Sequence, residues 1–232
     1  MKNNFLAFLF YCLISFNVSI AEQFNFETSE IQLIDNGNLI NAKDGKALSS
    51  DGNLEIQAEE FKYKKKENTL EAFNGVALFK EENLEIEFSE IIFDQKNLIT
   101  IAKKNVKIID LKKKVSIETS DLIYDKKNNY LESKNSSTIN DEFKNTLKVS
   151  YFLYNFNNGV LKFKDIHLKD TDDNNFFIKA AYLNTITNEL IGNDILVNLD
   201  NKSFNKDNEP RIKGKSIFYQ NKIAEINKGV FT

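Results

Sequence analysis

Residues 54–63 read LEIQAEEFKY and residues 84–93 read LEIEFSEIIF, so one pattern of apolar and acidic residues returns after 30 residues. Apolar and polar residues alternate within each copy, which is typical of β-strands because successive side chains point to opposite faces. A repeat of about 30 residues therefore dominates the chain of 232 residues. Further copies lie at 115–124, 146–154 and 177–183, and a looser copy lies at 212–219. A first copy, near the N-terminus, lies at 26–33.

The alternation changes phase once within each copy. Ile56 and Ala58 occupy one parity, whereas Phe61 and Tyr63 occupy the other. Such a change turns every following side chain to the opposite face unless the strand bends or bulges. We therefore expect each strand to bend near its middle, so that both halves direct their apolar residues inward.

A polar turn and a second apolar run follow each of these strands. No window carries the i, i+3, i+4, i+7 spacing of an amphipathic helix. The predicted fold is all-β: an elongated antiparallel stack of bent hairpins, with about seven repeats of about 30 residues, two facing sheets and an unpaired strand edge at each end. The turns and second runs that support it lie at 64–68, 125–129 and 155–159, and at 70–78, 98–108 and 161–168.

The first residues have the layout of a secretory signal peptide. Lys2 supplies a positive start, an apolar stretch follows, and the small residues Ser19 and Ala21 occupy the −3 and −1 positions of a cleavage site. The alternative is a transmembrane anchor, for which the stretch is short. We expect residues 1–21 to be removed on export and residues 22–232 to form one domain.

The composition excludes several classes of function. The chain has one His and one Cys, and Cys12 lies in the predicted signal peptide, so neither a usual zinc site nor another cofactor is expected. The formal net charge is −3, and Arg211 is the single Arg, which argues against nucleic-acid binding. The sequence contains neither a Gly-rich phosphate loop nor a convergent set of acid and base residues, so no motif indicates an enzyme.

The repeated strand carries an apolar residue, Ile two residues later, and an acidic–apolar–x–aromatic ending, while Gly75-Val76 lies in the second run. With the signal peptide, this pattern resembles the OstA-like repeat, the periplasmic β-jellyroll (β-taco) of the lipopolysaccharide (LPS) transport proteins. The tail at 209–214 and 227–232 resembles the end of the N-terminal domain of the LptD family, with the LptA and LptC families as the alternatives. The resemblance covers essentially all of residues 22–232.

This resemblance implies a periplasmic protein that binds LPS and conducts it toward the outer membrane. Each buried CH₂ of an acyl chain contributes roughly 0.8 kcal/mol, so an apolar groove would shelter lipid A while its sugars stay in water. The implied partners are other OstA-like domains, joined by strand addition at an exposed edge. For an LptD protein they also include an outer-membrane β-barrel, which would follow this domain, and its lipoprotein plug. LptD proteins have Cys residues near this domain, and residues 22–232 have none.

Groove-lining residues are expected at the inward positions of both strands of each hairpin. Plain core packing is the alternative for each of them, and in this architecture the core and the groove are one surface. The expected positions are Ile56, Phe61, Tyr63, Val76, Leu78, Ile86, Phe88, Ile91, Phe93, Ile101, Val106, Ile117, Leu122, Tyr124, Val149, Phe152 and Tyr154.

Two other classes of function remain open. A structural repeat protein, such as a β-solenoid scaffold or an adhesin, usually has shorter rungs with small side chains, whereas this chain has 20 Phe and 8 Tyr. A carbohydrate-active enzyme would need paired acids such as Glu81-Glu82, which we expect to be solvated at turns. Lysine runs such as 64–66 are expected to be solvated too, with LPS phosphates as the alternative contact, and His167 is expected to be structural.

Overall fold

The computed structural model describes residues 24–112, 114–140, 142, 146–169, 173–199, 210–221 and 223–232, and its regular structure there is entirely β-strand. The predicted signal peptide, residues 1–21, lies outside these ranges. The strands form one 17-stranded sheet. They are β1 (Phe24–Ile34), β2 (Leu39–Ser49), β3 (Leu54–Lys64), β4 (Thr69–Phe79), β5 (Leu84–Asp94), β6 (Ile99–Asp110), β7 (Val115–Asp125), β8 (Tyr130–Ser133), β9 (Ser137–Asn140), β10 (Thr146–Val149), β11 (Tyr151–Asn155), β12 (Val160–Lys169), β13 (Asn175–Asn184), β14 (Glu189–Asn198), β15 (Arg211–Gln220), β16 (Ile223–Asn227) and β17 (Val230–Phe231).

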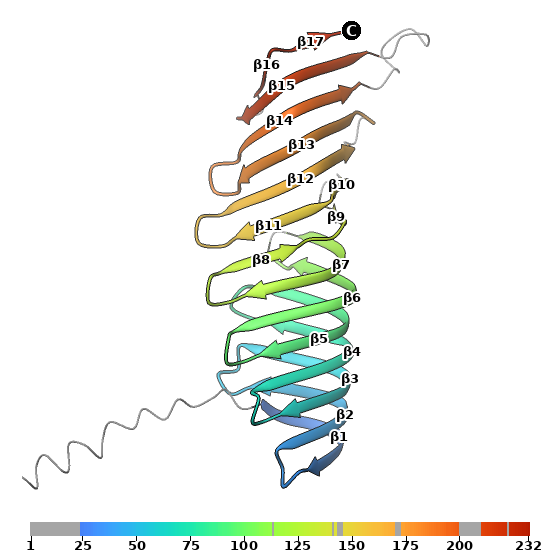
Figure 1. Ribbon diagram of the computed structural model, residues 1–232, viewed down its shortest axis with the longest axis vertical. Coiled ribbons are helices and arrows are strands. Elements are labelled where there is room, and N and C mark those ends of the chain that lie inside the picture. Colours follow the sequence, from blue (N-terminus) through green and yellow to red (C-terminus); the bar gives the residue numbers. More distant parts are fainter. Residues whose placement is uncertain are drawn as a thin grey trace, which may run out of the picture.

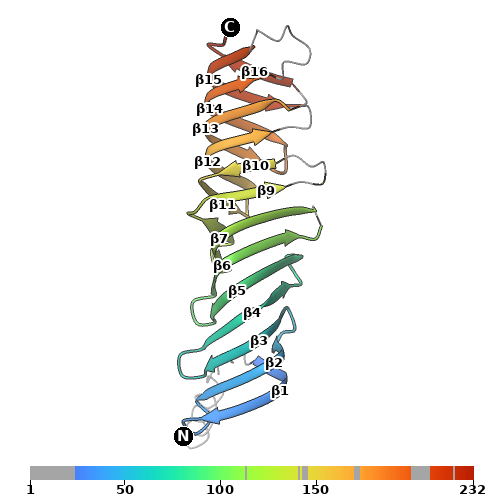
Figure 2. The ribbon, with the colours of Figure 1, turned by 90° about the vertical axis from the view of Figure 1, so that its right-hand side faces the viewer.

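Except at β8–β9, β10–β11 and β16–β17, each strand pairs antiparallel with the strand that follows it, so the sheet is a meander stacked along the long axis of the molecule (Figures 1 and 2). Near the middle, β8 and β9 are two halves of one interrupted strand, since β7 pairs with both. In the same way, β10 and β11 both pair with β12. The predicted fold class, an elongated all-β antiparallel stack of hairpins, is confirmed.

The bend predicted within the strands is present, and paired strands bend at the same level. In β3 and β4, Ile56 faces Ala77 and Phe61 faces Ala72, and all four side chains are buried. Within β3 the buried residues change from even-numbered (Ile56) to odd-numbered (Phe61), although the pairing register with β4 is the same for both. Between them Asn74 adopts a positive φ of 51°. The whole sheet is therefore folded along its length, and both halves of each strand bury their inward side chains.

Two walls and two rims follow from this bend. Wall B contains the first halves of β1, β3, β5 and β7, and wall A contains their second halves. The strands β2, β4 and β6 run in the opposite direction, so their first halves lie in wall A and their second halves in wall B. Rim A is the row of turns that ends wall A, rim B is the row that ends wall B, and the gap between the rims is called the mouth. The turns of rim A are 35–38, 65–68, 95–98, 126–129, 156–159 and 185–188, and those of rim B include 50–53 and 80–83.

Asp and Asn occupy most of the bends because their short side chains tolerate positive φ better than most others. Glycine follows the bend in β4, where a Cβ on Gly75 would lie 2.2 Å from the backbone oxygen of Gln57. Only a residue without a side chain permits that approach of two strands. The bend residues with positive φ in β2, β4, β12 and β14 are Asp44, Asn74, Asp165 and Asp194.

This bend corrects the prediction that Val76 and Leu78 face inward. The run from residue 70 to residue 78 was expected to keep one parity, but the strand turns over at Asn74. The buried inward residues of the second half of β4 are Ala77 and Phe79, while Val76 and Leu78 alternate with them on the outer face.

Ile101 is the third predicted inward residue that faces outward. In β6 the buried positions on either side of it are Thr100 and Ala102. Ile101 instead lies between Ile92 of β5 and Ile123 of β7 in the outer row. Further along, β6 has one more residue than its neighbours, and its register shifts on both sides as in a β-bulge.

The turns of rim A are hydrogen-bonded to one another as well as to their own strands. The first residue of each turn donates its N–H to the carbonyl of the last residue of the preceding turn. This ladder extends the sheet pairing to its border and fixes the spacing of the hairpins. The N···O pairs are Lys65–Asn38 at 2.8 Å, Gln95–Asn68 at 3.0 Å, Lys126–Leu98 at 3.0 Å, Phe156–Asn129 at 2.9 Å and Thr185–Gly159 at 2.9 Å.

The first prediction tests the position of the bend in β4. Ala77→Lys would force a charge into the interior and is expected to lower the free energy of unfolding by about 3 kcal/mol or more. Val76→Lys would place the same charge on the outer face beside Glu87, and a change below about 1 kcal/mol is expected. Denaturant unfolding of both variants measures this, and equal losses would contradict the assigned parity.

A second prediction concerns pH. The backbone and side-chain N–H groups of Asn128 each donate to the Asp125 carboxylate at 2.8 Å, and these hydrogen bonds hold its pKa below the usual value. A lowered pKa in the folded state stabilises the fold above the unfolded pKa of about 4, and that contribution is lost as pH falls through the folded pKa. In Asp125→Asn the free energy of unfolding should therefore fall less steeply below pH 4. Identical slopes would contradict this role.

Candidate functional site

The apolar interior between the two walls is the candidate site, and most of the predicted groove residues meet there. Of the 17 predicted positions, Val76, Leu78 and Ile101 lie outside it, for the reasons given above. Ile117 and Tyr154 are partly buried against the interior. The others are buried within it: Ile56, Phe61, Tyr63, Ile86, Phe88, Ile91, Phe93, Val106, Leu122, Tyr124, Val149 and Phe152.

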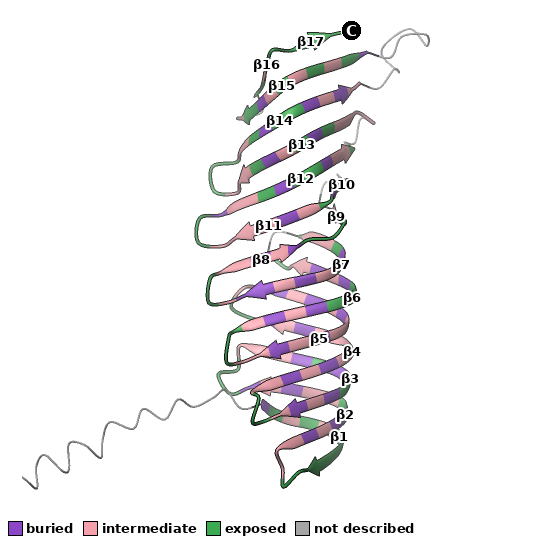
Figure 3. Ribbon diagram, in the orientation of Figure 1, coloured by how far each residue is buried: buried purple, intermediate pink, exposed green. Residues whose placement is uncertain are grey.

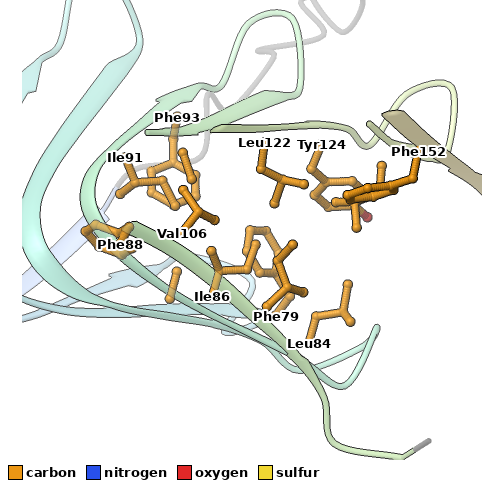
Figure 4. Close-up of a cluster of buried hydrophobic side chains, with 14 of the residues drawn as sticks. Phe79, Leu84, Ile86, Phe88, Ile91, Phe93, Val106, Leu122, Tyr124 and Phe152 are labelled. Atoms are coloured by element: carbon orange, nitrogen blue, oxygen red, sulfur yellow. The ribbon is translucent and has the colours of Figure 1, made fainter. Parts of the chain in front are cut away.

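Side chains of the two walls face each other across this interior (Figure 4). Phe79 and Ile86 project from wall B, whereas Leu122 and Tyr124 project from wall A. Phe88 lies at the bend, at the closed side of the fold. The interior of this part of the molecule is therefore packed with the protein's own side chains.

Inside rim A, one row of neighbouring side chains runs along the whole sheet. Aromatic residues recur there at the repeat spacing, at Tyr63, Phe93, Tyr124 and Tyr154. The strands between them contribute smaller side chains such as Leu70. The row continues through the register pairs Tyr154–Leu161, Leu161–Leu183, Leu183–Leu190 and Leu190–Tyr219.

Aromatic rings from both walls close the mouth over the first seven strands. Phe24 of wall B lies between Tyr63 and Phe93 of wall A, with ring centroids 5.9 and 6.4 Å apart. Phe79 of wall B lies between Phe93 and Tyr124, at 6.2 and 5.4 Å. Two of these contacts are edge-to-face, a geometry that aromatic rings favour. We call these five residues the aromatic zipper.

Polar contacts cover the zipper at the rims. Tyr124 Oη donates to Glu82 Oε1 across the mouth at 2.7 Å. Burial and this carboxylate both raise the pKa of Tyr124, so the phenol stays protonated. Asp51 of rim B and Lys126 of rim A line the same small cavity. Burial tends to raise the pKa of Asp51, but hydrogen bonds and the charge of Lys126 hold it below the usual value.

Sequence reasoning missed the wall B half of the zipper. Phe24 and Phe79 were not among the expected residues, because the bend that turns Phe79 inward was not recognised. Glu82 was expected to be a solvated acid, whereas it accepts the Tyr124 hydrogen bond. The repeat spacing of Tyr63, Phe93 and Tyr124 was the available signal, although it gives no information on which residues lie opposite.

Two other candidates from the sequence, Lys64 and His167, have partners on the outer surface. Lys64, from one of the lysine runs, pairs with Glu71 at 2.6 Å. His167 Nε2 lies 3.1 Å from Asn175 Oδ1, and its ring stacks on Phe177 at a centroid distance of 4.4 Å. Both side chains therefore take part in contacts of the outer face.

Within the described part of the chain, no three His, Cys, Asp or Glu residues are grouped closely enough to hold a metal ion. The same residues include no helix with the length and apolarity needed to cross a membrane. No protein-family model matches this sequence, and no curated protein matches it. The fold and the interior define an elongated antiparallel β-repeat protein with an apolar core along its axis.

A third prediction tests the contact between the rims. Tyr124→Phe removes a hydrogen bond to a carboxylate and is expected to lower the free energy of unfolding by about 1.5 kcal/mol. The matched control is Tyr63→Phe, since Tyr63 Oη donates at 3.2 Å to the neutral amide of Gln95, and a loss of about 0.5 kcal/mol is expected. Denaturant unfolding compares the two. A Tyr124→Phe loss no larger than that of the control would contradict a contact that stabilises the closed mouth.

Proposed function

We propose that this protein binds LPS and conducts it across the periplasm toward the outer membrane, as part of the LPS transport machinery. The observation that supports this most is the continuous apolar interior between the two walls, which lies inside every described hairpin. The resemblance of the repeat to the OstA-like domains supports the same function.

The chemistry of the interior suits acyl chains. Backbone N–H and C=O groups of the walls pair with neighbouring strands, so mainly apolar side chains face the interior. Each CH₂ that enters such a space from water contributes roughly 0.8 kcal/mol. The sugars and phosphates of LPS would remain at the mouth, where the rims carry charged side chains such as Asp51 and Lys126.

The free edge at β1 supports a second part of the proposal, the addition of another OstA-like domain. Among the described strands, β1 pairs only with β2. Ile31 and Leu33 are 52% and 65% exposed, although their neighbours Ala42 and Ile40 are buried. A strand added at this edge would cover both side chains and satisfy the free backbone groups.

Export by a cleaved signal peptide and a periplasmic location belong to the same proposal. If the chain is part of an LptD protein, the domain is held at the outer membrane, and the β-barrel with its lipoprotein plug is the next partner. An LptA- or LptC-like role needs only other OstA-like domains. In each case the protein has no catalytic task.

A structural scaffold is the second candidate function, and one observation favours it. The aromatic zipper fills the interior under β1–β7 with the protein's own side chains, as expected of a repeat protein that binds nothing there. The two functions differ in a measurable way, because a scaffold has no affinity for LPS.

The fourth prediction distinguishes them with a photo-crosslinking residue in the purified protein. Tyr154 lies in the inward row and is partly exposed, whereas Leu153, its neighbour on β11, lies in the outward row between Glu132 and Lys162. The crosslinker at position 154 is expected to capture LPS, because acyl chains enter the interior. At position 153 it is expected to capture much less. Equal capture, or none at position 154, would contradict LPS binding in the interior.

A further inference from the structure

The interior is closed along its N-terminal part. Tyr63, Phe93 and Tyr124 are at most 4% exposed, because Phe24 and Phe79 lie between them from the opposite wall. The hydrogen bond from Tyr124 to the opposite rim lies at the end of this closed stretch. An acyl chain can occupy the space under β1–β7 only after the zipper rings move.

The zipper ends at Tyr124. The next rings, Phe156 and Tyr154, continue from it at centroid distances of 5.9 and 4.5 Å, but both belong to the side of rim A. Among the described residues, no aromatic contact joins the two walls beyond Tyr124. The mouth therefore loses its aromatic closure where β11 begins.

Beyond this point the same inward row is partly exposed. The row stays apolar through Leu161, Leu183 and Leu190, and it ends at Tyr219, which is 38% exposed. Over all strand positions, Figure 3 shows that buried and intermediate residues predominate in β2–β8 and that exposed residues are more frequent in β12–β17. Deeper inward positions of these strands remain buried, among them Phe163, Ile166, Ile178, Ala181 and Ile195.

We call the partly exposed interior under β12–β15, with the row of Leu161, Leu183, Leu190 and Tyr219 along its mouth, the trough. A hydrocarbon chain is the occupant that this trough favours. No charged side chain occupies its described inward positions in β12–β14, whereas the outer face of the same strands carries charged side chains such as Lys162, Lys179 and Asp194. The backbones of β12, β13 and β14 are paired on both sides. A peptide laid in the trough would therefore leave its own N–H and C=O groups without partners, whereas a hydrocarbon chain has no such groups.

We propose that the interior is divided into two segments: an open trough under β12–β15 that loads a single hydrocarbon chain, and a segment under β1–β7 that the aromatic zipper keeps closed until its rings are displaced. This inference rests on the proposed function and specifies where its ligand enters. LPS and phospholipids both offer acyl chains, so the trough selects the chain, and the source of the chain is left to the experiment.

Photo-crosslinking along the interior of the purified protein tests this division. The crosslinking residue is placed at Leu183 in the trough or at Phe93 in the zipper, with Tyr182 and Ile92 as the outward neighbours for comparison. One set of samples receives LPS and a second receives dispersed phosphatidylglycerol. Capture at position 183 is expected to exceed capture at position 93 by about tenfold or more, the ratio that a difference of about 1.4 kcal/mol gives.

Each outcome bears on one of the two proposals. Equal capture at positions 93 and 183 would overturn the division of the interior while leaving LPS binding intact. No capture at either position would overturn the proposed function itself. Capture of both lipids at position 183 supports selection of the hydrocarbon chain, and capture of LPS alone supports the trough with LPS as the source.

Two sets of variants complete the test. Leu183→Asp places a charge in the trough and is expected to lower LPS binding by about tenfold, whereas Tyr182→Asp, on the outer face, should leave it unchanged. Phe79→Leu removes one zipper ring while keeping an apolar side chain, and it should raise capture at position 93. Unfolding curves confirm that each variant is folded. If Phe79→Leu left the capture of lipid at position 93 unchanged, that result would overturn the role of the zipper in closing the interior.

Discussion

The reversal of side-chain parity in the middle of paired strands is the constraint on which the rest of the structure depends. A strand that turns over keeps its neighbour's side chains on the matching face only if that neighbour turns over at the same level. The register of β3 and β4 runs without interruption through this point. The bend is therefore transmitted from strand to strand, and it produces the walls, the rims and the interior together.

In the hairpin of β3 and β4, the sequence reveals this constraint in the first strand and conceals it in the second. In β3 the change from Ala58 to Phe61 is visible as a break in alternation, so the bend could be predicted. In β4 the step falls at Asn74-Gly75, and the residues after it, Val76 and Leu78, are apolar on the outward parity. Apolar residues on both faces remove the alternation, and pattern alone then gives the wrong face.

The closure of the mouth could not be predicted for a different reason. Phe24 and Phe93 are far apart in the sequence, and they meet because the strands of the two walls are staggered across the fold. The repeat spacing identifies an aromatic row on wall A, but the contacts across the mouth depend on how far the sheet twists from strand to strand. That twist is a property of the assembled sheet, so no single copy of the repeat reports it.

Core packing and the proposed binding of acyl chains would use one and the same surface in this molecule. Under β1–β7 the protein's rings occupy the space, which stabilises the fold and excludes other molecules. Under β12–β15 the inward side chains are less covered, so that part contributes less to stability and offers more apolar surface. The two parts differ in coverage because aromatic side chains of both walls meet inside the rims under β1–β7, whereas the strands of both parts are paired antiparallel in the same way.

The ladder of turns along rim A has a consequence for the size of the molecule. Each turn of this ladder is bonded to the turn before it and the turn after it, and the rings of the aromatic zipper reach only as far as the second hairpin along, as from Phe24 to Phe93 and from Phe79 to Tyr124. Inserting or deleting one hairpin would change the length by about 9.5 Å without altering the contacts of distant hairpins. The distance that such a protein bridges is thus set in whole steps by the number of repeats its gene encodes.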